Sequence, residues 1–319
     1  MLNYFVFKAD KDCLQHTLKV GSVNFKITEL LDKYNIEFNG KPQLVPVPTK
    51  LVPGKCIVIT GHDLVDLRSL LDICQAENVN VYTHGEMLPS FMYPELSKYT
   101  CMKANYGHAW QLQQTEFDVF PGPVLFTTNC IMKPKASYIG KCFATGSVGY
   151  EGVKFIQNEH WDEVIAMAKE MTGFKDEAHC EEIQKKIQPE NHSIVGFNHR
   201  VFDDLAETLL GMIKAGDIKG FRFIGGCDGV SAKRNVFTQL AEDCPKDQIV
   251  LTGACGRFKV NHLALGDIKG IPRLLDVGQC NDVYSAIIIL VKLAGKLGCG
   301  VNDLPIELFV SWYEQKAIV

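Results

Sequence analysis

Six residues of types that commonly bind metal ions stand just after short apolar runs of this 319-residue sequence. For example, His62 follows Ile-Val-Ile-Thr-Gly, and Cys227 follows Phe-Ile-Gly-Gly. Such runs are typical of buried strands, and ligands of open α/β sheets bind beyond the carboxyl ends of the strands. We therefore predict that these residues meet in one metal site. They are His62, Glu86, Cys130, Cys227, Cys255 and Cys280.

The mixture of sulfur, nitrogen and oxygen donors indicates the kind of metal. Thiolates suit iron in a sulfide cluster, whereas imidazole and carboxylate suit iron with oxygen bridges. Zinc alone would be satisfied by four ligands. Buried thiolates and carboxylates also require cations nearby, because an unpaired buried charge is strongly destabilising. The donor types therefore favour an iron centre that is half sulfur and half oxygen.

Cysteine spacing restricts how this site can form. The chain has twelve cysteines, and no two are closer than Cys244 and Cys255, so there is no CxxC, zinc-knuckle or ferredoxin-type motif. The fold must therefore bring the ligands together from distant segments. Eight cysteines do not follow a strand in this way, and we expect them to be small buried residues or surface thiols. They are Cys13, Cys56, Cys74, Cys101, Cys142, Cys180, Cys244 and Cys299.

Short apolar strands alternate with helical segments along most of the chain. The expected strands are 56–60, 79–83, 124–127, 142–145, 193–197, 221–224 and 248–251. The expected helices are 18–35, 63–74, 161–171, 203–215, 234–242 and 282–297. This alternation is typical of parallel sheets covered by helices on both faces. We predict an α/β fold of two doubly wound, Rossmann-like domains with parallel sheets, preceded by a residual helical segment.

The expected domain limits follow from the irregular stretches. A helical remnant occupies 1–40, one α/β domain 41–190 and a second α/β domain 191–319. Four prolines between Pro42 and Pro53 predict an extended linker at the start of the first α/β domain. Residues 175–191 are charged and poorly periodic, so we place the boundary between the two α/β domains there.

Composition excludes several classes of function. The net charge is −4, and no stripe of Lys and Arg with interleaved aromatics is present, which argues against nucleic acid as a partner. The sequence shows no signal peptide, and no apolar run reaches the roughly 18 residues that span a bilayer. We therefore expect a soluble, cytoplasmic protein with no membrane partner.

Eight separated motifs, in one order along the chain, resemble the hybrid cluster protein family, also called prismane proteins or hydroxylamine reductases. The resemblance extends from about Thr17 to the end of the chain. The motifs are ITGHD, YTHGEMLP, NYGHAW, FTTNC, IGGCDG, TGACG, DVGQCND and SWYEQKA.

The resemblance implies a cofactor and a set of ligands. The cofactor would be a hybrid cluster of four iron, two oxygen and two sulfur atoms (4Fe-2O-2S). Glu314, in the SWYEQKA motif, would join the six residues named above as the seventh ligand, and Cys227 would be able to carry an additional sulfur as a persulfide. The implied activity is reduction of small nitrogen oxides: hydroxylamine to ammonia and water, and nitric oxide to nitrous oxide.

The physical chemistry of such a cluster adds expected roles for further residues. Movement of Glu86 would open a position on iron, and Glu314, Tyr313 and Lys316 would donate protons. For Tyr313, Lys316, His84 and Trp110, packing around the ligands, or a hydrogen bond that orients one, is the simpler alternative. Three aspartates that neighbour predicted ligands are expected to cap the following helices. They are Asp63, Asp228 and Asp282.

The sequence departs from the family pattern at both ends. Family members begin with a helical domain whose clustered cysteines bind a second cluster, of the 4Fe-4S or 2Fe-2S type, whereas Cys13 is the only cysteine of this chain before Cys56. We therefore expect no second cluster in this chain, truncation at both ends and an external electron-donor protein. Either the chain is an incomplete gene product, or a partner chain supplies the missing domain. Two other functions stay open: a module that senses nitric oxide or S-nitrosylates proteins, and an inactive fragment.

Overall fold

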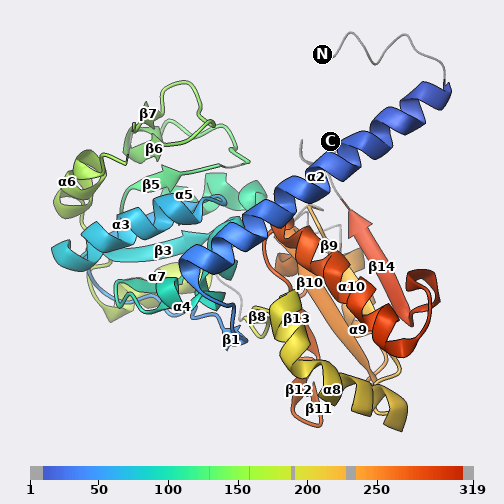
Figure 1. Ribbon diagram of the computed structural model, residues 1–319. Coiled ribbons are helices and arrows are strands. Elements are labelled where there is room, and N and C mark those ends of the chain that lie inside the picture. Colours follow the sequence, from blue (N-terminus) through green and yellow to red (C-terminus); the bar gives the residue numbers. More distant parts are fainter. Residues whose placement is uncertain (1–9, 129, 158, 188–190, 228–234, 312–319) are drawn as a thin grey trace.

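The computed structural model describes residues 10–128, 130–157, 159–187, 191–227 and 235–311. This part of the chain forms two six-stranded sheets with helices on both faces of each (Figure 1). A long helix, α2 (Asp10–Asn39), precedes them. No helix among the described residues combines the length and the apolar character needed to cross a bilayer.

The first sheet is entirely parallel. Its strands are β2 (Cys56–Thr60), β3 (Asn80–His84), β4 (Met102–Asn105), β5 (Val124–Phe126), β6 (Cys142–Ala144) and β7 (Lys154–Phe155), in the order β4-β3-β2-β5-β6-β7. Its helices are α3 (Leu64–Glu77), α4 (Pro94–Ser97), α5 (Gln113–Val119), α6 (Asp162–Glu170) and α7 (Glu177–Ile187). Every residue of β2 is buried. Ile57 and Ile59 share a core with α3 and α6, whereas Cys56 and Val58 share one with α5 and α7, so both faces of the sheet are covered.

The second sheet is parallel except at one edge. Its strands are β1 (Val45–Pro46), β8 (Ile194–Val195), β9 (Gly220–Gly226), β10 (Gln248–Gly253), β13 (Leu274–Asp276) and β14 (Ile306–Ser311), in the order β1-β8-β13-β10-β9-β14. Its helices are α8 (His199–Ala215), α9 (Val236–Glu242) and α10 (Val283–Leu297). Leu251 and Leu275 pack with α8 and α10, and Val250 and Leu274 pack with α9. Only β1, next to β8, runs antiparallel.

Tight 3-10 turns continue the chain where several strands end. The turn η1 (Gly85–Met92) follows β3 directly, η4 (Ala254–Lys259) follows β10 directly, and η5 (Cys280–Asp282) lies shortly after β13. The remaining short elements are η2 (Trp110–Leu112), η3 (Ile139–Lys141), η6 (Val301–Asp303) and the hairpin strands β11 (Asp267–Ile268) and β12 (Ile271–Pro272). Turns η1, η4 and η5 each carry a predicted metal ligand.

The predicted fold class is confirmed: the described chain is α/β, with two sheets of parallel strands. Strand 56–60 has the expected bounds, and Asp63 caps α3 by accepting hydrogen bonds from the backbone N–H groups of Val65 and Asp66. Helix α2 is longer than the expected 18–35 and packs on α4, α10 and η5. The domain limits at 40 and 190 stay predictions.

The stretch 175–191, which is charged and poorly periodic in the sequence, contains a helix. Eleven of these residues form α7, which buries Cys180, Ile183 and Ile187 against the first sheet. These positions lie three and four residues apart, on one face of a helix. Charged residues at the positions between them concealed this narrow apolar face in the sequence.

Asp66, in helix α3 beside the first sheet, makes the free energy of unfolding depend on pH. Burial, followed by the charges of Asp63 and Glu159, raises the pKa of Asp66 to about 7. A carboxyl whose pKa is raised in the folded state lowers stability as pH rises from its unfolded pKa towards its folded pKa. We expect Asp66→Asn to raise the free energy of unfolding at pH 8 by about 2 kcal/mol, discounted for partial solvent access, and to have little such effect at pH 4. Urea denaturation at both pH values tests this, with exposed Glu170→Gln as the control; an equal effect of Asp66→Asn at both pH values would contradict it.

Candidate metal centre

Two of the predicted ligands come from turns at the carboxyl end of the first sheet. His62 follows β2 after Gly61, and Glu86 is the second residue of η1. Both glycines that precede these residues, Gly61 and Gly85, have positive φ angles of 117° and 61°, which residues with a Cβ rarely adopt. The side chains of His62 and Glu86 are both buried. The sharp turns thus direct a nitrogen and an oxygen donor into the protein.

Cys280, from the second sheet, meets these two residues. Its Sγ lies 3.4 Å from His62 Nε2, and its backbone N–H donates to Glu86 Oε2 at 2.6 Å. His62 Nε2 and Glu86 Oε2 are 3.9 Å apart. One ligand atom from each of the three residues therefore lies within 4.8 Å of the others, with all three residues buried. This separation suits donors that share one metal centre.

The other three cysteines adjoin the same place. Cys130 and Cys255 line a small cavity together with His62 and Glu86. A hydrogen bond with Cys227 raises the pKa of the Cys255 thiol, and burial and the neighbouring Glu86 raise it further. Cys227 is held by its backbone N–H, which donates to Ser311 O of β14 at 2.5 Å. All six predicted ligands within the described chain therefore converge on one buried region.

Arg257 places a positive charge beside this group. The side chain is fully buried, and its Nη1 lies 2.9 Å from Asp276 Oδ2 while Nη2 lies 3.6 Å from Glu86 Oε1. Its guanidinium also donates to the carbonyl oxygens of Ala254 and Gly278, which belong to the turns that carry Cys255 and Cys280. Arg257 thereby connects the turns of the second sheet with Glu86 of the first.

Gln279 makes a second connection between the two sheets. Its Nε2 donates to His62 O at 3.3 Å and to Glu86 O at 2.8 Å. Its backbone N–H donates to Asp282 Oδ2 at 2.6 Å, so Asp282 holds the turn of Cys280 instead of making the predicted side-chain cap of α10. The backbone positions of three predicted ligands are therefore fixed by hydrogen bonds around them.

A buried histidine and glutamate lie next to the cavity. His84 Nδ1 is 3.0 Å from Thr60 Oγ1, and His84 Nε2 is 2.9 Å from Glu116 Oε2. The other oxygen of Glu116 is 2.6 Å from His108 Nδ1. Burial alone would raise the pKa of Glu116, but the hydrogen bonds with His108 and His84 outweigh it and lower the pKa. Glu116 is therefore a carboxylate held between two imidazoles.

Two of the other predicted residues lie near the metal centre. His84 contacts Thr60 and Glu116 as described, and Trp110 lines the small cavity. Four predicted residues lie outside the described part of the chain: Asp228, Tyr313, Glu314 and Lys316. Three residues of the site were not predicted, namely Arg257, Gln279 and Glu116. A signal was present for two of them, since Arg257 stands two residues after Cys255 and Gln279 directly precedes Cys280.

The donor chemistry fits an iron centre of the predicted kind. Thiols, an imidazole and a carboxylate gather in a buried region, and a raised thiol pKa is what a bound cation reverses when it takes up a thiolate. The cavity among them measures about 10 Å³, the space of one water molecule. The donor side chains themselves therefore fill the region where a cluster would be bound.

Comparisons with known proteins agree on the family. The sequence profile of the Prismane/CO dehydrogenase family matches residues 4–319. Proteins named hydroxylamine reductase from Acidiphilium cryptum and Solidesulfovibrio magneticus are 44% and 46% identical to the chain, over 95% and 98% of its length. The chain spans about half the length of these relatives, 53% and 57%. A third hydroxylamine reductase, from Moorella thermoacetica, is 45% identical over 96% of the chain and 69% of its own length.

Solved structures share the fold at much lower sequence identity. Carbon monoxide dehydrogenase IV from Carboxydothermus hydrogenoformans aligns with a TM-score of 0.64 and 17% identity, over 91% of this chain and 54% of its own. A chain of an acetyl-CoA synthase/carbon monoxide dehydrogenase structure aligns with a TM-score of 0.65 and 14% identity, over 89% of this chain and 50% of its own. These matches show a shared fold. Because the family profile spans residues 4–319, the chain belongs to the Prismane/CO dehydrogenase family.

Proposed function

We propose that the chain binds a hybrid iron–sulfur–oxygen cluster and reduces hydroxylamine to ammonia and water. The observation that supports this is the convergence of His62, Glu86 and Cys280 within 4.8 Å, with Cys130, Cys227 and Cys255 beside them. The relatives named hydroxylamine reductase point to the same substrate. Nitric oxide, reduced to nitrous oxide, is the second substrate of this proposal.

When bound, the cluster would supply electrons and an open iron position for a small molecule with an N–O bond. The protein contributes the donors, the charge balance and the exclusion of water. Arg257 offsets part of the negative charge of Glu86 and the thiolates, and Gln279 fixes the backbone of His62 and Glu86. We expect no second cluster in this chain, so electrons would come from an external donor protein.

Anaerobic reconstitution tests the proposal. The purified chain is incubated with ferrous iron and sulfide, desalted, and analysed for iron per chain, electron paramagnetic resonance and hydroxylamine consumption with a reduced viologen dye. Bound iron, a cluster signal and ammonia formation are expected together. A chain that remains free of iron contradicts the cluster, and a loaded chain that leaves hydroxylamine unchanged contradicts the reductase activity.

Glu86 should matter more for turnover than for holding iron. Glu86→Ala removes one oxygen donor but leaves the imidazole and the four thiols, so we expect the reconstituted variant to keep most of its iron. Its kcat for hydroxylamine should fall at least about 100-fold, in the range found when a catalytic acid–base or ligand carboxylate is lost. Exposed Glu151→Ala is the matched control and should behave as the unaltered chain. Wild-type turnover in Glu86→Ala would show that the carboxylate has no part in the reaction.

A further inference from the structure

A chain of hydrogen bonds connects the small cavity of the metal centre with a second, larger pocket. It begins at Thr60, whose Oγ1 lies 3.0 Å from His84 Nδ1. It continues from His84 Nε2 to Glu116 Oε2 at 2.9 Å, and from Glu116 Oε1 to His108 Nδ1 at 2.6 Å. All three links have ordinary hydrogen-bond lengths, and each joins groups that can both donate and accept a proton.

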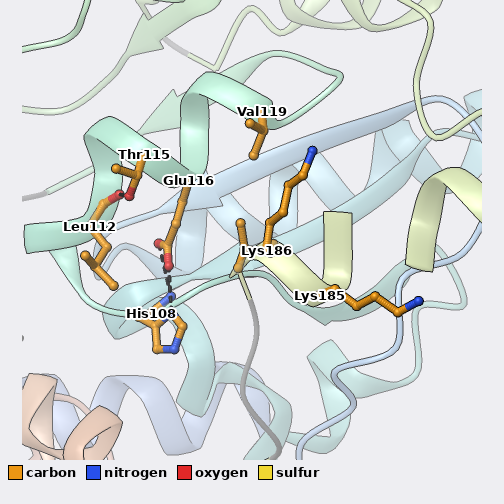
Figure 2. A pocket seen from close by; sticks show the side chains of 8 residues that line it. His108, Leu112, Thr115, Glu116, Val119, Lys185 and Lys186 are labelled. Carbon is orange, nitrogen blue, oxygen red and sulfur yellow. Dashed lines mark hydrogen bonds and ion pairs between the residues drawn. The ribbon is translucent and has the colours of Figure 1, made fainter. Parts of the chain in front are cut away.

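The two ends of this chain differ in their access to water. Thr60 lines the cavity that His62, Glu86, Cys130 and Cys255 share, and it is buried. His108 and Glu116 line a pocket of about 580 Å³ between α5 and α7, where the side chain of His108 is 16% exposed (Figure 2). The middle of the chain is dry, because His84 is fully buried and its ring packs against Phe117 with centroids 4.6 Å apart. Among the described groups, this series of side chains therefore joins an open pocket to the buried donors.

The geometry points to His108, Glu116, His84 and Thr60 as a relay that delivers protons from the outer pocket to the metal centre. This inference rests on the proposed function, since reduction of hydroxylamine breaks an N–O bond and consumes two electrons and two protons to give ammonia and water. The external donor protein supplies the electrons. A buried site without continuous water needs a separate path for the protons, and side chains in hydrogen-bond contact provide one.

The transfer balances at every step if the carboxyl group of Glu116 turns. His108 takes up a proton on Nε2 from the pocket and gives the proton on Nδ1 to Glu116 Oε1. The carboxyl group then turns, so that its new O–H faces His84 Nε2. With His84 in the tautomer that carries its proton on Nδ1, Nε2 takes the proton from Glu116 while Nδ1 gives its proton to Thr60 Oγ1, whose own hydroxyl proton passes into the cavity. One N–H or O–H bond breaks and one forms at each link, and tautomer exchange of both histidines with rotation of the Thr60 hydroxyl restores the starting state. The path depends on contact between the groups and needs no change in their charge at equilibrium.

Glu116→Gln tests the relay with little change of shape, because an amide cannot carry a proton between two imidazoles. In the reconstituted protein we expect unchanged iron per chain and an unchanged electron paramagnetic resonance signal. The kcat for hydroxylamine should fall about 10- to 100-fold with KM unaltered, and the solvent deuterium isotope effect on kcat should increase. Thr115→Val is the matched control, since Thr115 lines the same pocket and its hydroxyl donates only to Leu112 O among the described groups.

A measurement without hydroxylamine separates the relay from the proposed activity. The reconstituted protein is reduced by a viologen radical, which gives up its electron without releasing a proton, in weak buffer; a pH-indicator dye follows proton uptake while loss of the radical's absorbance follows reduction. Proton uptake should keep pace with reduction in the unaltered chain and in Thr115→Val, but lag behind it in Glu116→Gln. An unaltered chain that takes up protons but leaves hydroxylamine intact contradicts the proposed function alone. Equal proton uptake in all three proteins, or none in the unaltered chain, would overturn the relay.

His108→Ala provides a second variant at the exposed end, where substitution disturbs the core least. Its kcat and proton uptake should fall as in Glu116→Gln. Added imidazole can enter a pocket of about 580 Å³ and should restore both quantities towards those of the unaltered chain. A purely structural role of His108 predicts no rescue by imidazole. Absence of rescue, with the protein folded and loaded with iron, would remove His108 from the path.

Discussion

Arg257→Met is expected to lower the free energy of unfolding of the metal-free protein by about 3–5 kcal/mol. The guanidinium is fully buried and is paired with Asp276, which is itself fully buried. Removing it leaves the carboxylates of Asp276 and Glu86 without their nearest cation and removes the donors to Ala254 O and Gly278 O. Urea unfolding followed by circular dichroism measures the loss.

Two further variants show whether burial is the cause. Arg222→Met removes an ion pair with half-exposed Glu307 and a hydrogen bond to Leu240 O, and should cost less, about 1–2 kcal/mol. Arg257→Lys keeps the charge but lacks the planar set of donors, so its loss should lie between these values. Equal losses in Arg257→Met and Arg222→Met would mean that burial of the Arg257–Asp276 pair adds nothing to its effect on stability.

Cys255→Ala is expected to prevent assembly of the cluster, with iron after reconstitution falling at least tenfold. Cys255 lies at the centre of the donor group, because it interacts with Cys227, Glu86 and Cys280 and also lines the cavity. Removing this thiol deletes a donor that touches both halves of the site. Iron analysis and the visible absorption of the reconstituted protein measure the effect.

Cys74→Ala is the matched control for that experiment. Cys74 is equally buried, but it lies in α3 within the apolar core of the first sheet, away from the donors. Its replacement should cost about 1 kcal/mol of stability, from lost packing, while iron loading stays unchanged. If both variants lose iron alike, the loss reflects general instability, and Cys255 would have no special place in the site.

Several of the buried strands could be predicted because they are continuous apolar runs. Strand 56–60 was predicted with its observed bounds, since all five of its residues are buried and glycine or polar residues follow. Strand β14 was missed because it lies at a sheet edge, where Leu308 and Val310 are exposed and the burial pattern gives no clear period. Edge strands and helices with a narrow buried face, such as α7, carry too little apolar signal in one sequence.

The donors of the site could be predicted from the sequence, whereas Glu116, which contacts His84, could not. Each donor follows a strand, and parallel strands of one sheet bring their carboxyl ends to one edge, so His62 can be associated with Glu86, and Cys255 with Cys280, without knowledge of distances. The contact of His62 with Cys280 joins two different sheets and is seen only in the structure. Glu116 gives no such sign, because it lies inside α5 and reaches His84 only through packing that the sequence does not encode locally. A contact of this kind, across 32 residues of chain, emerges only in the folded structure.

The two-residue strand β1 determines how the two sheets can move apart. Val45 pairs with Val195 and Pro46 with Ile194, so the segment that leads into the first sheet is fastened beside the segment that leads out of it. The pairing at β1 is not the sole link between the sheets, because Gln279 donates to His62 O and Glu86 O, and Arg257 is paired with Glu86. A movement that separated the two sheets would therefore have to break the backbone pairing at β1 together with the contacts around the donors.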